Sequence, residues 1–271
     1  MPQRNLTVRT RDGLHLAGTL VQPEQETDRA VVLVHGGGVT RDEAGFFTRL
    51  ADGLATSGVA SLRFDLRGHG ESEGRQEDLT LAGILADVSG ALGVIRGQTG
   101  AGRVSLLGAS FSGGVCGYYA AEQQGALASL VMFNPLLNYK KRFIDDKPYW
   151  HDDQLDDTAA RELSANGYLA HSPTFKLSRA LLNEVFYLRP ERALSRITTP
   201  TLIVHGAEDT FIPVESSRQA DGQIAGETKL IEIDGAQHGF AVHDDPTYAQ
   251  PRSQQWQAFV IEATAEWIST H

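Results

Sequence analysis

A run of continuously apolar residues at 30–34 is followed along the chain by five similar, mostly apolar runs, and amphipathic segments separate them. The five runs cover residues 59–64, 104–107, 127–133, 201–204 and 230–233. Strands that are apolar at nearly every position are typical of a parallel sheet buried on both faces. Strands that alternate with helices predict crossover connections between parallel neighbours. We therefore expect an α/β fold, with a mostly parallel sheet and helices on both faces.

Two segments depart from this alternation. Residues 6–10 and 14–21 alternate in polarity around a turn, which predicts an antiparallel N-terminal hairpin. Residues 135–195 contain no strand-like run and are charged, aromatic and helical in pattern. Because ligands of open α/β folds bind at the carboxyl edge of the sheet, we interpret this segment as a helical cap inserted there. Residues 1–134 and 196–271 then form the core.

Charge and cysteine content exclude several classes of function. The 271 residues carry a formal net charge of -10, and the longest basic run is only Lys140-Lys141-Arg142, so we expect no nucleic-acid partner. The single cysteine, Cys116, excludes an internal disulfide and fits a reducing compartment. The polar N-terminus lacks a secretory signal, and no apolar stretch is long enough to span a membrane. We expect a cytoplasmic protein, and a homodimer remains open.

Two serine motifs compete for the role of a nucleophile. The literal G-x-S-x-G is Gly70-Glu71-Ser72-Glu73-Gly74, whereas Gly108-Ala109-Ser110-Phe111-Ser112 is an imperfect copy. A nucleophile elbow needs a strand before the serine and a helix after it. Ser110 has both, whereas Ser72 lies in a polar stretch several residues beyond its strand and is expected to be a loop residue. The effect of Ser112, where a second glycine is usual, stays open.

Two further residues follow later predicted strands. Asp209 comes after the run at 201–204, and His238 comes after the run that ends at Ile233. Parallel strands end at one edge of the sheet, so both side chains are expected beside Ser110. A serine hydroxyl needs a base, and the base needs an orienting carboxylate. We predict a catalytic triad of Ser110, His238 and Asp209. Glu208 is the rival acid, His243 the rival base, and Asn134 cannot carry a carboxylate charge.

An oxyanion hole requires two backbone N–H groups aimed at the developing negative charge. One is expected from Phe111, directly after the nucleophile. The other is expected from the glycines after His35, with Gly37 favoured and Gly36 or Gly38 left open. His35 is expected to brace this loop. No cluster of residues resembles a zinc site, so we predict no metal and no cofactor.

Together these motifs resemble the α/β-hydrolase superfamily of serine hydrolases. They are His35-Gly36-Gly37-Gly38, the Arg63 to Ser72 segment, the elbow at Ser110, His205-Gly206-x-x-Asp209 and His238-Gly239-Phe240. The Arg63 to Ser72 segment is similar to a loop of small bacterial carboxylesterases, including cinnamoyl- and feruloyl-esterase-like members. The resemblance implies an eight-stranded sheet and hydrolysis of carboxylic esters through an acyl-enzyme intermediate.

Substrate and reaction class are less constrained than mechanism. An alternative is a thioesterase or acyltransferase that acts on acyl thioesters, and a less favoured one is a non-catalytic binding protein. In each catalytic case the partner is a small-molecule ester or thioester. Four aromatic residues of the cap are candidates for substrate binding, although they could instead pack the cap onto the core: Tyr149, Trp150, Tyr168 and Phe186.

Overall fold

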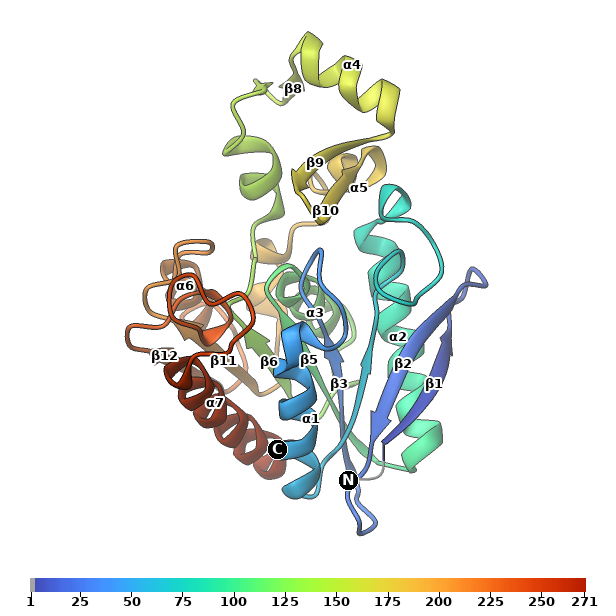
Figure 1. Cartoon of the computed structure of the whole chain (residues 1–271), viewed down its shortest axis with the longest axis vertical. Helices are drawn as coiled ribbons and strands as arrows, with labels where there is room; N and C mark the ends of the chain where they lie inside the picture. The colour runs from blue at the N-terminus through green and yellow to red at the C-terminus, as the bar shows by residue number, and fades with distance from the viewer. Residues whose placement is uncertain (1–2) are drawn as a thin grey trace.

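The structure is a computed structural model that describes residues 3–271. Met1 and Pro2, part of the polar N-terminus discussed above, lie outside the described residues. An eight-stranded sheet runs through the molecule in the order β1-β2-β4-β3-β5-β6-β11-β12 (Figure 1). Its strands are β1 (Gln3–Arg9), β2 (His15–Val21), β3 (Arg29–Val34), β4 (Ala60–Phe64), β5 (Arg103–Ala109), β6 (Leu130–Phe133), β11 (Thr201–Gly206) and β12 (Thr228–Ile233).

The predicted sheet is confirmed in both its parallel and antiparallel parts. β1 and β2 form the N-terminal hairpin, and β2 also pairs with β4 in antiparallel fashion. All remaining pairings are parallel. No helix within residues 3–271 is long and apolar enough to cross a membrane.

Helices cover both faces because the central strands are apolar on both faces. On β3, Val31 and Leu33 pack into one hydrophobic cluster while Val32 and Val34 pack into the other. The first cluster includes residues of α1 (Phe46–Thr56) and α7 (Pro251–Thr270), which lie side by side in Figure 1. The second cluster includes residues of α2 (Leu81–Thr99), α3 (Phe111–Glu122) and α6 (Glu215–Asp221).

Residues 135–195, called the insertion below, form no strand of the main sheet. They contain η3 (Lys141–Asp145), β7 (Trp150–His151), β8 (Gln154–Leu155), α4 (Asp157–Asn166), β9 (Tyr168–Ser172), β10 (Phe175–Ser178), α5 (Arg179–Glu184) and η4 (Pro190–Arg192). The remaining short helices of the chain are η1 (Glu43–Gly45), η2 (Gln76–Asp78), η5 (Leu194–Arg196) and η6 (His238–Phe240).

The expectation of a purely helical insertion was wrong, because β9 and β10 form an antiparallel hairpin. Leu169, Phe175 and Leu177 are buried, while the residues of the turn between the strands are exposed or half-buried. Strands of four or five residues with so few apolar positions produce no continuous run, so the sequence pattern did not reveal them. The helices α4 and α5 begin at capping residues, since the Asp156 and Ser178 side chains accept hydrogen bonds from backbone N–H groups of the first turn.

The strand order reverses around β3, and this reversal positions the functional loops. The chain passes from β3 through α1 to β4, and then through α2 to β5 on the opposite side of β3. The loops after β3 and β5 therefore diverge and leave a crevice at the carboxyl edge of the sheet. Val34 of β3 is in register with Gly108 of β5, which brings the glycine loop and the serine elbow together.

A buried ion pair fastens the loop after β4 to helix α2. Nε and Nη2 of Arg67 donate to the two carboxylate oxygens of Asp87 at 2.7 and 2.6 Å, and the Asp87 side chain is fully buried. Arg67 also donates to Asp12, whose side chain is 57% exposed. Asp87 is therefore the buried partner of the Arg67 guanidinium, and Asp12 is its exposed partner.

This arrangement predicts unequal stability losses for the two carboxylates. Asp87→Ala should lower the free energy of unfolding by about 3–5 kcal/mol, because the buried Nε of Arg67 loses its hydrogen-bond partner and only the exposed Asp12 remains to pair with the guanidinium. Asp12→Ala is the matched control and should cost about 1 kcal/mol or less, because its pair with Arg67 is exposed to solvent. Urea denaturation of the two variants measures the difference, and equal losses would contradict the assignment.

Candidate active site

Ser110 occupies a tight turn between β5 and α3. Its backbone has φ 51° and ψ -120°, a left-handed conformation that an L-residue adopts only under constraint. Its N–H donates to the carbonyl of Phe133 at 2.8 Å, and its own carbonyl accepts from Leu136 at 2.9 Å. A Cβ on Gly113 would lie 2.5 Å from Cβ of Pro135, so the elbow needs a glycine there.

The structure brings Ser110, His238 and Asp209 into one hydrogen-bonded row. Oγ of Ser110 lies 3.0 Å from Nε2 of His238, and Nδ1 of His238 lies 2.6 Å from Oδ2 of Asp209. The loops that carry Asp209 and His238 are joined directly, since the N–H of Glu208 donates to the carbonyl of Ala236 at 3.0 Å. The three side chains therefore converge from three loops at the same sheet edge.

Asp209 is held as an anion by its surroundings. Burial of the carboxyl group works to raise the pKa of Asp209, but hydrogen bonds from His205 and His238 outweigh it, and the net pKa is well below the ordinary value. The other oxygen accepts from the backbone N–H groups of Phe211 and Ile212 at 2.8 and 2.9 Å. A carboxylate with this many donors stays charged and fixes the ring of His238.

The other residues weighed from the sequence take no part in this row, although His243 and Asn134 line the same cavity as Ser110. His243 pairs with Asp244 at 3.5 Å, and its side chain is 74% exposed. The side-chain oxygen of Asn134 accepts from the backbone N–H of Gly206 at 3.0 Å, which is a structural contact. Within residues 3–271, no group of three or more His, Cys, Asp and Glu is arranged to hold a metal ion.

The glycine loop after β3 lies against the elbow. A Cβ on Gly36 would lie 3.3 Å from Cβ of Ser110, and a Cβ on Gly37 would lie 2.9 Å from the ring of Phe175. Gly37 is therefore enclosed by the β9–β10 hairpin, where a larger residue would displace that ring. Phe111 begins α3, so its N–H has no partner within the helix, and Phe111 lines the same small cavity as Gly37.

His35 braces the glycine loop, as the sequence suggested. Its Nε2 accepts from the N–H of Leu66 at 2.9 Å, and its Nδ1 donates to the carbonyl of Gly36 at 2.7 Å. Burial, together with the neighbouring His69, lowers the pKa of His35 to about 4, so the ring is neutral near pH 7. His69 continues the brace by accepting from the N–H of Gly38 at 3.1 Å.

Ser112 has a role of its own where the elbow pattern usually has glycine. Its side chain is fully buried, and its Oγ donates to the carbonyl of His35 at 2.6 Å. This bond ties the first turn of α3 to the end of β3. Ser112 does not require a left-handed backbone, so a small side chain suffices and the elbow forms around it.

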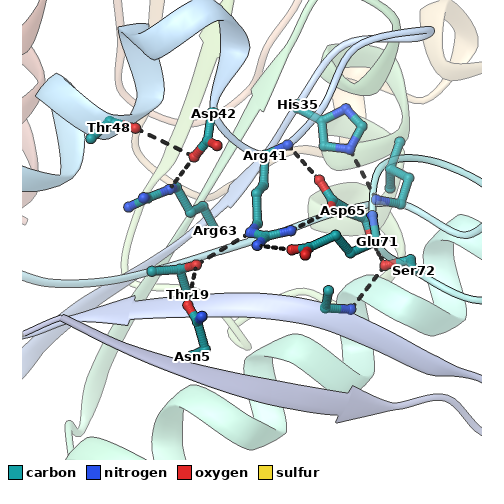
Figure 2. A network of polar contacts seen from close by, with 12 residues as sticks. Asn5, Thr19, His35, Arg41, Asp42, Thr48, Arg63, Asp65, Glu71 and Ser72 are labelled. Atoms are coloured by element: carbon teal, nitrogen blue, oxygen red, sulfur yellow. Dashed lines mark hydrogen bonds and ion pairs between the residues drawn. The ribbon is translucent and has the colours of Figure 1, made fainter.

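Ser72 lies in a structural network and not beside His238. Its Oγ donates to the carbonyl of Asp65 at 2.6 Å and accepts from the N–H of Ala17 at 2.9 Å (Figure 2). Asp65 is fully buried, and it binds the side chain and the N–H of Arg41. The literal motif therefore joins the loop after β4 to strand β2.

Glu43 is a further carboxyl group at the site that was not predicted from the sequence. Its Oε1 accepts from the N–H of Gly36 at 2.6 Å, and it lines the same cavity as Ser110 and His238. Glu43 and Ala44 both have left-handed backbones, with φ of 45° and 49°. Burial raises the pKa of Glu43 to about 7, although the bond from Gly36 and the proximity of His238 oppose this shift. Only the strained backbone places this carboxyl group there, and no sequence motif signals it.

Two cavities meet at Ser110. The larger, of about 620 Å³, is lined by residues of α1 and of the loop that contains His238. The smaller, of about 60 Å³, lies toward the insertion and is lined by Gly37, Ser110, Phe111, Leu136, Arg142, Phe143, His171, Ser172, Phe175 and Phe211.

The four aromatic candidates for substrate binding line neither cavity. Trp150 packs against Phe186 with ring centroids 6.0 Å apart, and Tyr168 lies under the ammonium group of Lys176. Tyr149 is half-buried against the hydrophobic core. Phe143 and Phe175 of the same segment line the smaller cavity in their place.

The raised pKa of Glu43 predicts a pH-dependent contribution to stability. Between the ordinary value of 4.5 and about 7, the folded protein retains a proton that the unfolded chain has released. The free energy of unfolding should therefore fall as pH rises through this window. In Glu43→Gln, which retains an acceptor for Gly36, this component should disappear. Urea denaturation across the window compares the two proteins, and parallel curves would argue against the shift.

Comparisons with known proteins agree with this architecture. Monoacylglycerol lipase of Mycolicibacterium smegmatis is 25% identical to this chain over an alignment of 280 positions. The alignment covers 96% of this chain and 94% of that protein. The solved structure of Est1E from Butyrivibrio proteoclasticus with ferulic acid bound has a TM-score of 0.76 at 22% identity, and covers 96% of this chain and 99% of its own. DcsB in complex with its substrate analogue has a TM-score of 0.75 at 18% identity, and covers 99% of both chains. These two structures share the fold. The model of the alpha/beta hydrolase family matches residues 31–249, and the chain belongs to that family.

Proposed function

We propose that the protein is a serine hydrolase that cleaves carboxylic esters through an acyl-enzyme intermediate. The observation that carries the proposal is the row Ser110–His238–Asp209, with distances of 3.0 and 2.6 Å, built on a left-handed Ser110. Hydrolases of this family and the 25% identical monoacylglycerol lipase support ester hydrolysis in general. The assignment of nucleophile, base and orienting acid is our inference from the geometry.

In the first step, Oγ of Ser110 attacks the ester carbonyl carbon while its proton passes to Nε2 of His238. Asp209 accepts from Nδ1, so it selects the tautomer whose Nε2 is free to take that proton. The negative charge that develops on the carbonyl oxygen is assigned to the N–H groups of Gly37 and Phe111. Removal of one such donor typically lowers the rate about 10²–10³-fold. The carbon–oxygen ester bond then breaks, and His238 returns the proton to the departing alcohol.

In the second step, water replaces the alcohol. His238 accepts a proton from the water as its oxygen attacks the acyl carbon, and the tetrahedral intermediate collapses to the free acid. The proton returns to Oγ of Ser110, which restores the enzyme. A thiol leaving group would follow the same path, so a thioester substrate differs only in the bond that breaks.

We assign the insertion the role of a cap over the acyl side of the site. Phe175 of the β9–β10 hairpin lies on Gly37, and Figure 1 shows the β9–β10 hairpin and α4 of the insertion above the sheet. The hairpin thus excludes water from the proposed oxyanion hole on one side. In water-excluded surroundings, hydrogen bonds to a developing charge are stronger than in solvent.

Labelling with a fluorophosphonate probe tests the nucleophile. Wild type and Ser72→Ala should be labelled, whereas Ser110→Ala should not, because Ser110 has a histidine within hydrogen-bond distance and Ser72 binds only backbone groups. Ser72→Ala is the matched control, since it makes the same substitution in the literal motif. Circular dichroism verifies that each variant folds. Labelling that survives in Ser110→Ala and disappears in Ser72→Ala would overturn the proposal.

A substrate panel then separates esterase from thioesterase and acyltransferase. The panel contains esters of increasing acyl length, hydroxycinnamoyl esters and acyl thioesters. We expect oxygen esters to be turned over faster than thioesters of the same acyl group, with free acid as the product. Preference for thioesters, or acyl transfer to an added alcohol in place of water, would favour the alternative.

A further inference from the structure

Arg142 is a charged residue beside the nucleophile that has no ion pair among the described residues. Its guanidinium group lies 4.2 Å from the ring centre of Phe211, and its Nε is buried without a hydrogen-bond partner. Burial lowers its pKa, while the charges of Asp146 and Asp209 oppose that shift without either carboxylate pairing with it. An arginine remains protonated in proteins. A positive charge therefore persists here without a carboxylate partner.

His171 presents a second unpartnered nitrogen to the same space. Its Nδ1 is buried and has no hydrogen-bond partner, and its ring packs edge-on against Phe143 with centroids 5.1 Å apart. Burial, assisted by the charges of Lys147 and Arg142, lowers the pKa of His171 to about 4. The ring is therefore neutral near pH 7, and it can donate one hydrogen bond without carrying a charge of its own.

Both residues line the small cavity that also contains Ser110 and Phe111. Its volume of about 60 Å³ is several times the ~10–15 Å³ that one water molecule needs, so it accommodates a short chain of a few heavy atoms. The remaining wall is largely apolar and includes Leu136, Phe143 and Phe175. An acyl chain that leaves Ser110 on this side therefore meets apolar residues and two side chains that each have a nitrogen without a partner.

The geometry points to a substrate whose acyl group ends in a carboxylate, namely a monoester of a short dicarboxylic acid. This inference rests on the proposed esterase function and specifies its substrate class. The guanidinium of Arg142 would bind the carboxylate, and His171 would donate a further hydrogen bond. Buried polar groups normally have partners, and an anion would satisfy both of these.

The same arrangement disfavours neutral acyl chains of equal length. A methyl group at the end of the cavity would leave the nitrogens of Arg142 and His171 without partners. A site built to bind a polar group discriminates strongly against an analogue that lacks it, because the partners of that group remain buried and unsatisfied. Arg142 is thus proposed as a specificity-determining residue that touches the substrate but not the reacting atoms.

Turnover of two nearly isosteric esters tests the inference. Monoethyl succinate carries the distal carboxylate, whereas ethyl levulinate replaces it with a neutral methyl ketone. In wild type, kcat/KM should be higher for monoethyl succinate. Arg142→Met should lower the ratio of the two kcat/KM values about 10- to 100-fold, as expected for loss of a charged hydrogen bond. Arg142→Lys should retain part of the preference, because it keeps the charge but not the planar geometry.

Lys141→Met is the matched control. Lys141 is the neighbouring cation, its side chain is 62% exposed, and it pairs with Asp146. This variant should leave the ratio unchanged, which separates local recognition from the general charge of the surface. A ratio that is equally sensitive to Lys141→Met, or insensitive to Arg142→Met, would overturn the inference.

Calorimetric titration of Ser110→Ala, which lacks the proposed nucleophile, with monoethyl succinate and ethyl levulinate measures the same recognition without turnover. Monoethyl succinate should bind more tightly than ethyl levulinate does, and the added Arg142→Met substitution should abolish the difference. This measurement stays informative even if no ester is cleaved, so a failure of the proposed esterase function is distinguished from a failure of this inference. Equal binding of the two esters to Ser110→Ala would overturn it.

Discussion

The contact between the serine elbow and the end of β3 is the constraint on which the rest of the site depends. Ser110 has a left-handed backbone, and Ser112 donates its hydroxyl proton to the carbonyl of His35. These two features bring the first turn of α3 against the glycine loop, so that Gly37 and Phe111 line one cavity beside Ser110. The cost of the strained backbone is offset by bonds from its own turn to Phe133 and Leu136.

The two sides of Ser110 differ in chemical character. On one side, the larger cavity is lined by three acidic residues, Glu43, Asp244 and Asp245, and by no lysine or arginine. On the other, the small cavity contains Arg142 and no acidic residue. An ester whose acyl part is anionic and whose alcohol part is neutral or basic fits this distribution better than the reverse.

Much of the site could be predicted from sequence because its chemistry follows strand ends. Ser110, Asp209 and His238 each follow an apolar run within a few residues, and parallel strands end at one edge of a sheet. The literal motif at Ser72 was set aside because no helix was expected after it, and its hydroxyl binds backbone groups of Asp65 and Ala17. The β9–β10 hairpin was missed because its strands are too short for a continuous apolar pattern. The aromatic candidates of the insertion were misplaced because composition does not tell which ring faces a cavity.

The sequence by itself determined the order of strands and helices, the hairpin at the start and the three residues after the strand ends. These depend on local patterns of polarity, which the chain carries in each segment. Tertiary structure alone decided which cavity wall each side chain of the insertion lines, how Glu43 reaches Gly36 and why Arg142 has no partner. Those features depend on contacts between residues far apart in the chain, and no local pattern encodes a distance between two loops.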